Sequence, residues 1–281
     1  MQETQSPLTQ NQADSDEESR ITDAFVKGDK LNYKSYLMQE RYKKVKLDYP
    51  REMKAPPLWV EVSYAVITRK RRFIAKFDGG IYFGDGNSTR FGLWSFLGDK
   101  TKQLVVSQDI FRGGTQWVAS LSPHFHIIFD GPAWGVGREA DDMGVIDLDG
   151  DGVYEITVPI TDFYELQDKL SISQIPLPEI MFKYDPLKGK YLPANPLFPR
   201  YLIKGIGTAE EEVSGNDQFA IRSAVLDKLL TYIYVGRERE AWAFYDRAYT
   251  LDDREEIKRR VKSILRKQPV YKFIYNHAYY K

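Results

Sequence analysis

The chain has 281 residues, and its 40 Lys and Arg residues balance 40 Asp and Glu residues, so the formal net charge is zero and bulk attraction to nucleic acid or anionic lipid is not expected. The absence of cysteine excludes disulfides, thiolate metal sites and cysteine nucleophiles. No apolar stretch approaches the ~20 residues of a transmembrane helix, and the length fits one large domain or two small ones.

The first 19 residues are polar, rich in Gln, Ser, Asp and Glu, and are predicted to be a disordered segment. They contain no apolar signal core, which fits either a cytoplasmic protein or the mature form of an extracytoplasmic one. Residues 20–50 carry apolar side chains at loosely helical spacing, from Ile21 and Phe25 to Tyr33, Tyr36 and Leu37. Gly28 interrupts this pattern, so two short helices are expected.

Residues 56–200 read as a β-rich domain of antiparallel strands. The stretches LWVEVSYAVI, FIAKFD, QLVVSQDIF, TQWVASL, HFHIIFD and VYEITVPI are rich in β-branched and aromatic residues. RKRR, at Arg69–Arg72, is expected to be a hairpin tip, and the other basic runs, Arg41–Lys46 and Arg259–Lys267, to be solvated faces. Gln174–Arg200 is rich in proline and aromatic residues and is predicted to be an extended arm packed on the sheet, with a polyproline ligand as the alternative.

Residues 217–281 are predicted to form a three-helix C-terminal bundle, which makes the fold class α+β. Ile221, Val225 and Leu229 have helical spacing, and the last predicted helix has acidic residues at its start and basic residues at its end, as suits the helix dipole. A further set of residues, Tyr232, Gly236, Ala241, Tyr245 and Ala248, resembles one tetratricopeptide repeat. This resemblance implies a helix-turn-helix pair and nothing about peptide binding.

The sequence DLDGDGVYE, at Asp147–Glu155, places acidic residues at the first, third, fifth and ninth positions, with Gly152 at the sixth. Ca²⁺ prefers several oxygen ligands, and a glycine at the sixth position allows a sharp turn. The predicted metal ligands are the side chains of Asp147, Asp149, Asp151 and Glu155 and the carbonyl of Val153. Val158 stands where an EF-hand has its bidentate Glu, so a strand-loop-strand site is expected.

This loop resembles the calcium loops of FG-GAP and VCBS-type repeats, which occur in integrin propellers and secreted bacterial proteins. The match covers about Gly135 to Pro159 and implies one structural Ca²⁺ ion, without implying a propeller. The missing twelfth ligand predicts an affinity near ~10⁻⁴ M, which suits an extracytoplasmic location, secreted or periplasmic, with a cytoplasmic location as the alternative. The competing interpretation of the loop is an Asp-Gly turn with no ion.

His124, His126 and Asp130 form a second candidate metal site. On a strand the three side chains would share one face and hold Zn²⁺ or Fe²⁺ for a metal-assisted hydrolase. The alternative is that the histidines lie on a polar face without a metal, because Phe125, Ile127 and Phe129 would form the opposite, core-facing side. No nucleophile elbow, P-loop or dinucleotide fingerprint is present in the sequence.

The chain is rich in aromatic residues, with 19 Tyr, 15 Phe and 5 Trp. Trp94, Trp117 and Trp134 would serve either as an exposed platform for a sugar or peptide or as part of a large β core. The sequence therefore favours a non-catalytic, calcium-stabilised extracytoplasmic module that binds a protein or a glycan and no nucleic acid. The alternatives are the metal-assisted hydrolase and a structural assembly subunit.

Overall fold

The computed structural model describes residues 19–20, 25, 29–47, 58–78, 88–98, 100–110, 113–137, 143–204 and 218–276. The first 18 residues of the predicted disordered segment lie outside this part of the chain, whereas Ser19 belongs to strand β1 (Ser19–Arg20). Within the described residues, no helix has the length and apolar character needed to cross a membrane.

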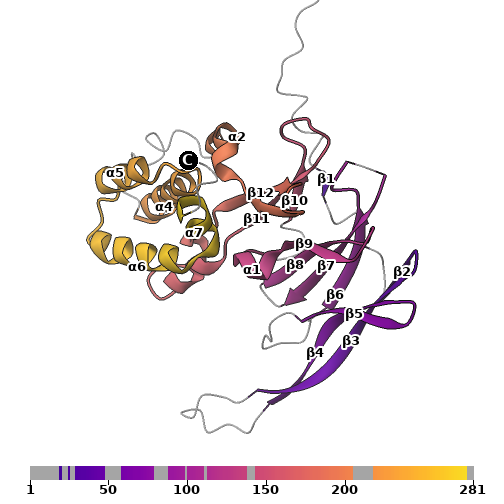
Figure 1. Cartoon of the computed structure of the whole chain (residues 1–281). Helices are drawn as coiled ribbons and strands as arrows, with labels where there is room; N and C mark the ends of the chain where they lie inside the picture. Colours follow the sequence, from indigo (N-terminus) through magenta and orange to yellow (C-terminus); the bar gives the residue numbers. More distant parts are fainter. Residues whose placement is uncertain are drawn as a thin grey trace, which may run out of the picture.

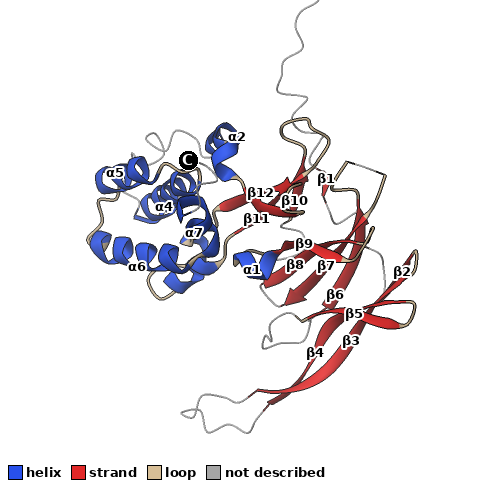
Figure 2. Cartoon of the chain, viewed as in Figure 1, coloured by secondary structure: helices blue, strands red, loops and turns tan. Residues whose placement is uncertain are grey.

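The described strands form three antiparallel sheets, and the helices gather at one side of them (Figures 1 and 2). Sheet A contains β1, β10 (Gly144–Ile146), β11 (Glu155–Pro159), β12 (Glu179–Asp185) and β13 (Lys190–Pro193). Sheet B contains β6 (Ser88–Trp94), β7 (Gln103–Ile110), β8 (Gly113–Ser120) and β9 (His126–Asp130). Sheet C contains β2 (Lys30–Tyr33), β3 (Tyr36–Leu47), β4 (Leu58–Arg69) and β5 (Arg72–Phe77).

The short helices expected in residues 20–50 are not found where the structure describes this region. Residues 30–47 instead form the β2–β3 hairpin, and β3 pairs with β4 along its whole length. The spacing of Tyr33 and Tyr36 arises from the two-residue turn between them and not from a helix. Pairing with β4 buries Tyr36 and Met38 on one face, which outweighs the local helical pattern.

The predicted extended arm also needs correction, because its residues supply two strands of sheet A. β12 pairs with β11 on one edge and with β13 on the other. Ile180 and Phe182 are fully buried between these neighbours. Their alternating spacing, which fits a strand, was therefore the informative signal, and the prolines lie outside the paired part of β12.

The helical part of the chain confirms the α+β class. The described helices are α1 (Gly131–Trp134), α2 (Pro199–Lys204), α4 (Gln218–Tyr234), α5 (Glu238–Ala248), α6 (Arg254–Lys267) and α7 (Pro269–Asn276), with 3₁₀ turns at Asp162–Leu166, Ile172–Gln174 and Asn195–Leu197. The α6 helix has Glu255 and Glu256 in its first turn and Arg266 and Lys267 in its last. The α7 helix, which starts at Pro269, extends the three helices expected from the sequence.

The pair α4–α5 has the helix-turn-helix geometry expected for residues 232–248. Gly236 adopts a positive φ of 87° between the two helices, a conformation that favours glycine. Ala241 and Tyr245 are buried in the pair, and the Tyr245 ring stacks on the Tyr249 ring at 4.9 Å. The small residue and the neighbouring tyrosine therefore fill the interface in the way that the spacing predicts.

Sheet B lies between two apolar cores. One core, between sheets B and C, includes Met38, Ile67, Phe91 and Val106. The larger core joins the other face of sheet B to sheet A and the C-terminal helices, and it contains Val105, Val118, Val158, Phe182, Val225 and Leu229. The helical tail and sheets A and B therefore share a single hydrophobic core.

Replacing Leu229 by Ala should destabilise the whole of this shared core. The side chain is fully buried in α4, and removing it should cost about 2–5 kcal/mol of unfolding free energy. Calorimetry should show a single transition that moves to lower temperature. The variant Ile172→Ala, at a position that is 59% exposed, is the control and should change little. Two transitions, of which only one moves, would show that the helices unfold independently of the sheets.

Candidate functional site

The acidic loop, residues 147–155, connects β10 to β11 at the end of sheet A. The structure brings Asp147, Asp149 and Asp151 together, with one carboxylate oxygen from each lying within 4.8 Å of the others. Glu155, the first residue of β11, is fully buried behind them. The alternating spacing seen in the sequence therefore produces one convergent group of carboxylates.

The backbone of the acidic loop is held by its own side chains. The Asp147 carboxylate accepts a hydrogen bond from the Gly152 N–H at 3.0 Å, and the Asp151 carboxylate accepts one from the Val153 N–H at 2.8 Å. The Glu155 carboxylate accepts one from the Leu148 N–H at 2.9 Å. These bonds fold the loop back on itself, so its shape is set before any ligand arrives.

A second turn, between β6 and β7, packs directly against this loop. A Cβ atom built on Gly98 would lie 1.9 Å from the Gly152 carbonyl oxygen, which no side chain can tolerate. In addition, the Tyr154 N–H donates to the Phe96 carbonyl at 2.9 Å, and the Tyr191 hydroxyl donates to the Tyr154 carbonyl at 2.9 Å. Sheets A and B together therefore fix the position of the loop.

Lys183, on the neighbouring strand β12, completes the charged cluster. Its Nζ atom lies 2.7 Å from Asp149, 2.8 Å from Asp151 and 3.1 Å from Glu155. The ammonium group therefore stands among three carboxylates, where a metal ion would neutralise the same charges. The sequence pattern of the loop does not reveal this residue, because Lys183 is brought there by strand pairing.

The cluster changes the ionisation of its members. Burial alone would lower the pKa of Lys183, but the hydrogen bonds to Asp149, Asp151 and Glu155 outweigh it and raise this pKa well above its ordinary value. The Lys183 hydrogen bond lowers the pKa of Asp151. Burial raises the pKa of Glu155 in spite of its bonds from Leu148 and Lys183. The charged ammonium is thus strongly favoured, while the buried Glu155 depends on it.

The second candidate metal site is not assembled. Among the described residues, Asp147, Asp149 and Asp151 form the metal-type group that the structure brings together, and His124, His126 and Asp130 do not form another. The Asp130 carboxylate instead accepts a hydrogen bond from the Ala133 N–H and caps α1. The His126 ring contacts the His124 carbonyl oxygen at 3.1 Å.

The face assignment predicted for this strand is also wrong at one position. Ile127 is 39% exposed, whereas Ile128 and Phe129 are both buried. A register shift between Val118 and Ala119 on the paired strand β8 breaks the simple alternation. The two histidines are exposed and lie outside the buried core.

The tryptophans expected either as a platform or as core belong to the core. Trp117 is buried between sheets B and C. Trp94 and Trp134 are partly buried and pack against the larger core, where the Trp94 ring meets the Tyr154 ring edge-on at 6.3 Å. Exposed aromatic side chains lie elsewhere in the described residues, at Tyr42, Trp59 and Phe73 of sheet C and at Tyr201 of α2.

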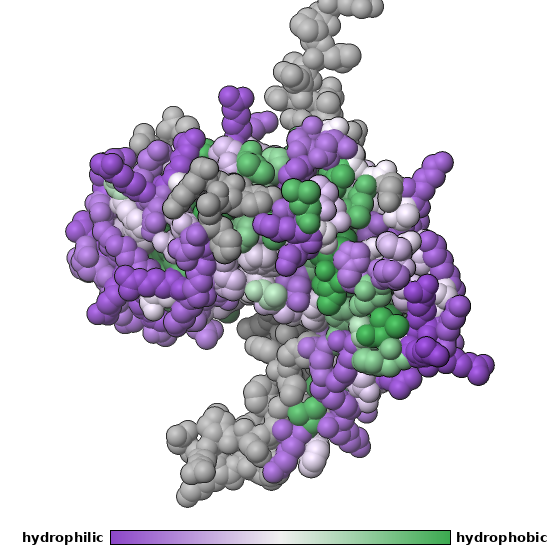
Figure 3. All heavy atoms as spheres, in the orientation of Figure 1, coloured by the Kyte–Doolittle hydropathy of each residue, from purple (hydrophilic) through white to green (hydrophobic). Residues whose placement is uncertain are grey.

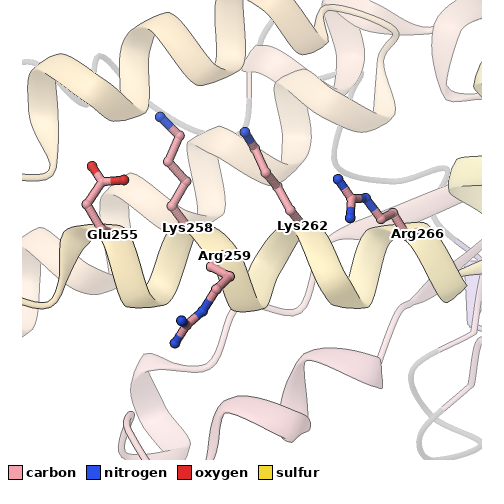
Figure 4. A pocket seen from close by; sticks show the side chains of 5 residues that line it. All are labelled: Glu255, Lys258, Arg259, Lys262 and Arg266. Carbon is pink, nitrogen blue, oxygen red and sulfur yellow. The ribbon is translucent and has the colours of Figure 1, made fainter.

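A basic surface hollow of about 360 Å³ lies along α6 (Figure 4). Lys258, Lys262 and Arg266 point to one side of the helix in this view, and Arg259 points to the other. Lys258 forms an ion pair with Asp246, and the Lys262 Nζ atom lies 4.8 Å from the centre of the Trp242 ring. Two of these cations therefore have partners within the protein. Lys262 and Arg266 are exposed, as expected for a solvated helix face.

A more apolar hollow, of about 330 Å³, lies beside the acidic loop. It is lined by Leu148, Leu197, Phe198, Pro199, Arg200 and Tyr201. Leu197 is 53% exposed and Tyr201 is 39% exposed. Because Leu148 belongs to the loop, any ligand in this hollow would contact a residue whose position depends on the charged cluster.

A comparison with protein-family models, curated proteins and solved structures finds no match to this chain. The resemblance to FG-GAP and VCBS-type repeats therefore rests on the loop sequence, and the tetratricopeptide resemblance on one helix pair.

Replacing Lys183 by Met should destabilise the protein in the absence of metal ions. Glu155 would stay buried without its cation, so we expect a loss of about 1–3 kcal/mol at neutral pH. Because the pKa of Glu155 would rise further, this loss should shrink as the pH falls towards about 4, where the carboxyl is protonated in the unfolded chain as well.

Chemical denaturation at several pH values measures this effect. Lys190→Met removes a charge from an exposed position on β13 and is the matched control. Equal stability of wild type and Lys183→Met at neutral pH would show that the cluster contributes nothing to the fold.

Proposed function

We propose that the protein is a non-catalytic binding module whose acidic loop takes up one Ca²⁺ ion. The observation that carries the proposal is the convergence of Asp147, Asp149 and Asp151 to within 4.8 Å on a preformed loop. Carboxylate oxygens at this separation can turn onto one ion that accepts ligands at 2.3–2.6 Å. The Val153 carbonyl and Glu155 remain the further proposed ligands.

In this proposal Lys183 and Ca²⁺ compete for the same carboxylates. The ammonium is close to Asp149, Asp151 and Glu155, so an incoming ion must displace it or share the carboxylates with it. Asp147 is the exception, because its second oxygen, Oδ1, is buried and has no hydrogen-bond partner among the described residues. The competition predicts weak binding, which is useful only where Ca²⁺ is abundant, and this favours an extracytoplasmic location.

The proposed ligand surface is the hollow beside the loop. Leu197, Phe198 and Tyr201 offer apolar and aromatic contacts, and Arg200 offers a hydrogen-bonding cation. Such a mixture suits a protein segment or a glycan. Uptake of Ca²⁺ would act on this surface through Leu148, which borders the hollow and belongs to the loop. The ion would thus have a structural role and no reacting group to activate.

The proposal is tested by thermal unfolding in EGTA, in millimolar Ca²⁺ and in millimolar Mg²⁺. An ion that binds only the folded state stabilises it by RT ln(1 + [L]/Kd), about 1.4 kcal/mol at ten times Kd. Ca²⁺ should raise the melting temperature of the wild type by a few degrees. Mg²⁺ should do less, because it demands a tighter octahedral site.

Two variants make the test specific. Lys183→Met removes the competitor, so its response to Ca²⁺ should exceed that of the wild type. Asp147→Asn removes a carboxylate that forms no ion pair with Lys183, so it should abolish the response and leave the ammonium cluster in place. Melting curves that are identical in EGTA and Ca²⁺ for both the wild type and Lys183→Met would rule the proposal out.

A further inference from the structure

Positive charge is concentrated in sheet C, although the whole chain is neutral. Residues 29–47 and 58–78 contain eleven Lys and Arg residues and four Asp and Glu residues, a difference of +7. Part of this charge is compensated, since Lys43 and Lys76 both form ion pairs with Asp78. Four exposed cations that form no ion pair within the described residues lie at the end of the sheet where two hairpin turns meet.

We call this end the basic tip and define it as Lys34, Lys70, Arg71, Arg72 and Phe73. Lys34 lies in the β2–β3 turn, and the other four residues belong to the β4–β5 turn and the start of β5. The two turns are tied together, because the Lys70 N–H donates to the Ser35 carbonyl at 3.2 Å. The tip lies at the edge of the molecule opposite the helices (Figure 1).

The cations of the basic tip have no counter-charge among the described residues. All four are exposed, and within the described part of the chain none of them forms an ion pair. Phe73 follows them directly and is 66% exposed, the largest value of any exposed aromatic side chain in the described residues. In Figure 3, hydrophilic residues at this side of the molecule border an area of hydrophobic ones. The tip thus offers an apolar group beside four cations without an ion-pair partner among the described residues, one of which, Lys34, lies 5.2 Å from the centre of the Tyr33 ring.

The backbone of the tip gives an independent indication of function. Lys70 and Arg71 have φ values of 50° and 64°, so both central residues of the two-residue turn are in the left-handed region. Such a hairpin turn favours Asn-Gly, because residues with larger side chains are strained at positive φ. Two long cationic side chains at these positions do not serve the stability of the turn, and both are exposed and available to contact another molecule.

We propose that the basic tip docks on a membrane surface that contains anionic lipid headgroups. Lys and Arg side chains near such a surface are attracted to its anionic headgroups, and an apolar side chain such as Phe packs at the boundary between the headgroups and the acyl chains. A nucleic acid fits less well, because single strands are held in a groove by a series of stacked aromatic side chains. The tip is a protruding corner with one exposed ring.

This docking is separate from the proposed uptake of Ca²⁺. The basic tip belongs to sheet C, whereas the acidic loop belongs to sheet A, and the two sheets lie on opposite faces of sheet B. Loss of one activity should leave the other intact. The local charge of the tip also accounts for binding of an anionic surface by a chain of zero net charge.

The deciding variant is Lys70→Asn with Arg71→Gly, which gives the turn its preferred sequence. We expect this double variant to melt at a higher temperature than the wild type, since it relieves the positive-φ strain. At the same time it should bind vesicles of equal parts phosphatidylglycerol and phosphatidylcholine about 30-fold more weakly, because two cations near the surface are lost. Co-sedimentation of the full chain with vesicles measures the binding.

Three controls test whether binding depends on the tip itself, on net charge or on the bilayer. The double variant Lys262→Gln with Arg266→Gln removes the same charge from the exposed side of α6 and should bind these vesicles like the wild type. Phe73→Ser should weaken the binding that remains at high salt, where the charges are screened. Vesicles of phosphatidylcholine alone should not bind.

The proposal is overturned if the wild type does not bind the anionic vesicles, or if it binds neutral vesicles equally. It is also overturned if the α6 variant loses as much binding as the tip variant, since net charge would then decide. Tighter binding to a single-stranded oligonucleotide than to vesicles, lost in the tip variant, would assign the tip to nucleic acid instead.

Discussion

The antiparallel pairing of β11 with β12 inside the larger core positions the charged cluster. Ile156 pairs with Phe182, and both side chains are fully buried. The next residues towards the acidic loop, Glu155 and Lys183, therefore lie side by side on the opposite face of the two strands. Because the apolar pair cannot shift register without exposing its side chains, the distance between the carboxylate and the ammonium is set by hydrophobic packing. Electrostatic attraction then acts on groups that are already in place.

A lysine among the carboxylates changes whether a calcium-type loop needs an external cation in order to fold. In a loop without such a residue, mutual repulsion makes the fold depend on an external cation. Here Lys183 supplies a positive charge from the chain itself and bonds to Asp149, Asp151 and Glu155. The loop can therefore keep its shape without a metal ion, while Asp147 keeps an oxygen that no described protein group satisfies. Under the proposed uptake of Ca²⁺, the ion would exchange with the Lys183 ammonium at these carboxylates.

The sequence predicted well where structure follows from local pattern. The Asp147–Glu155 spacing, the strands from LWVEVSYAVI to VYEITVPI and the charge order of α6 were all visible without a structure. Prediction from the sequence failed where pairing between strands distant in the sequence decides the conformation or the burial of a residue. The β3 strand owes its conformation to β4, Ile128 is buried because of a register shift opposite Val118, and Lys183 reaches the loop through a strand that looked like an arm. These three features depend on pairing between distant strands, so the spacing of residues within one segment does not predict them.

The contact between Gly98 and Gly152 has an evolutionary consequence. It joins two turns that are far apart in the sequence and leaves no room for a side chain at position 98. In a lineage descended from this chain, the two turns should therefore change together, and a loss of glycine at 98 should accompany a rebuilt acidic loop. The β12–β13 turn is under no such constraint, since Leu187 there is 96% exposed and Gly189 has open space around it. Insertions should accumulate at that turn and spare the other two.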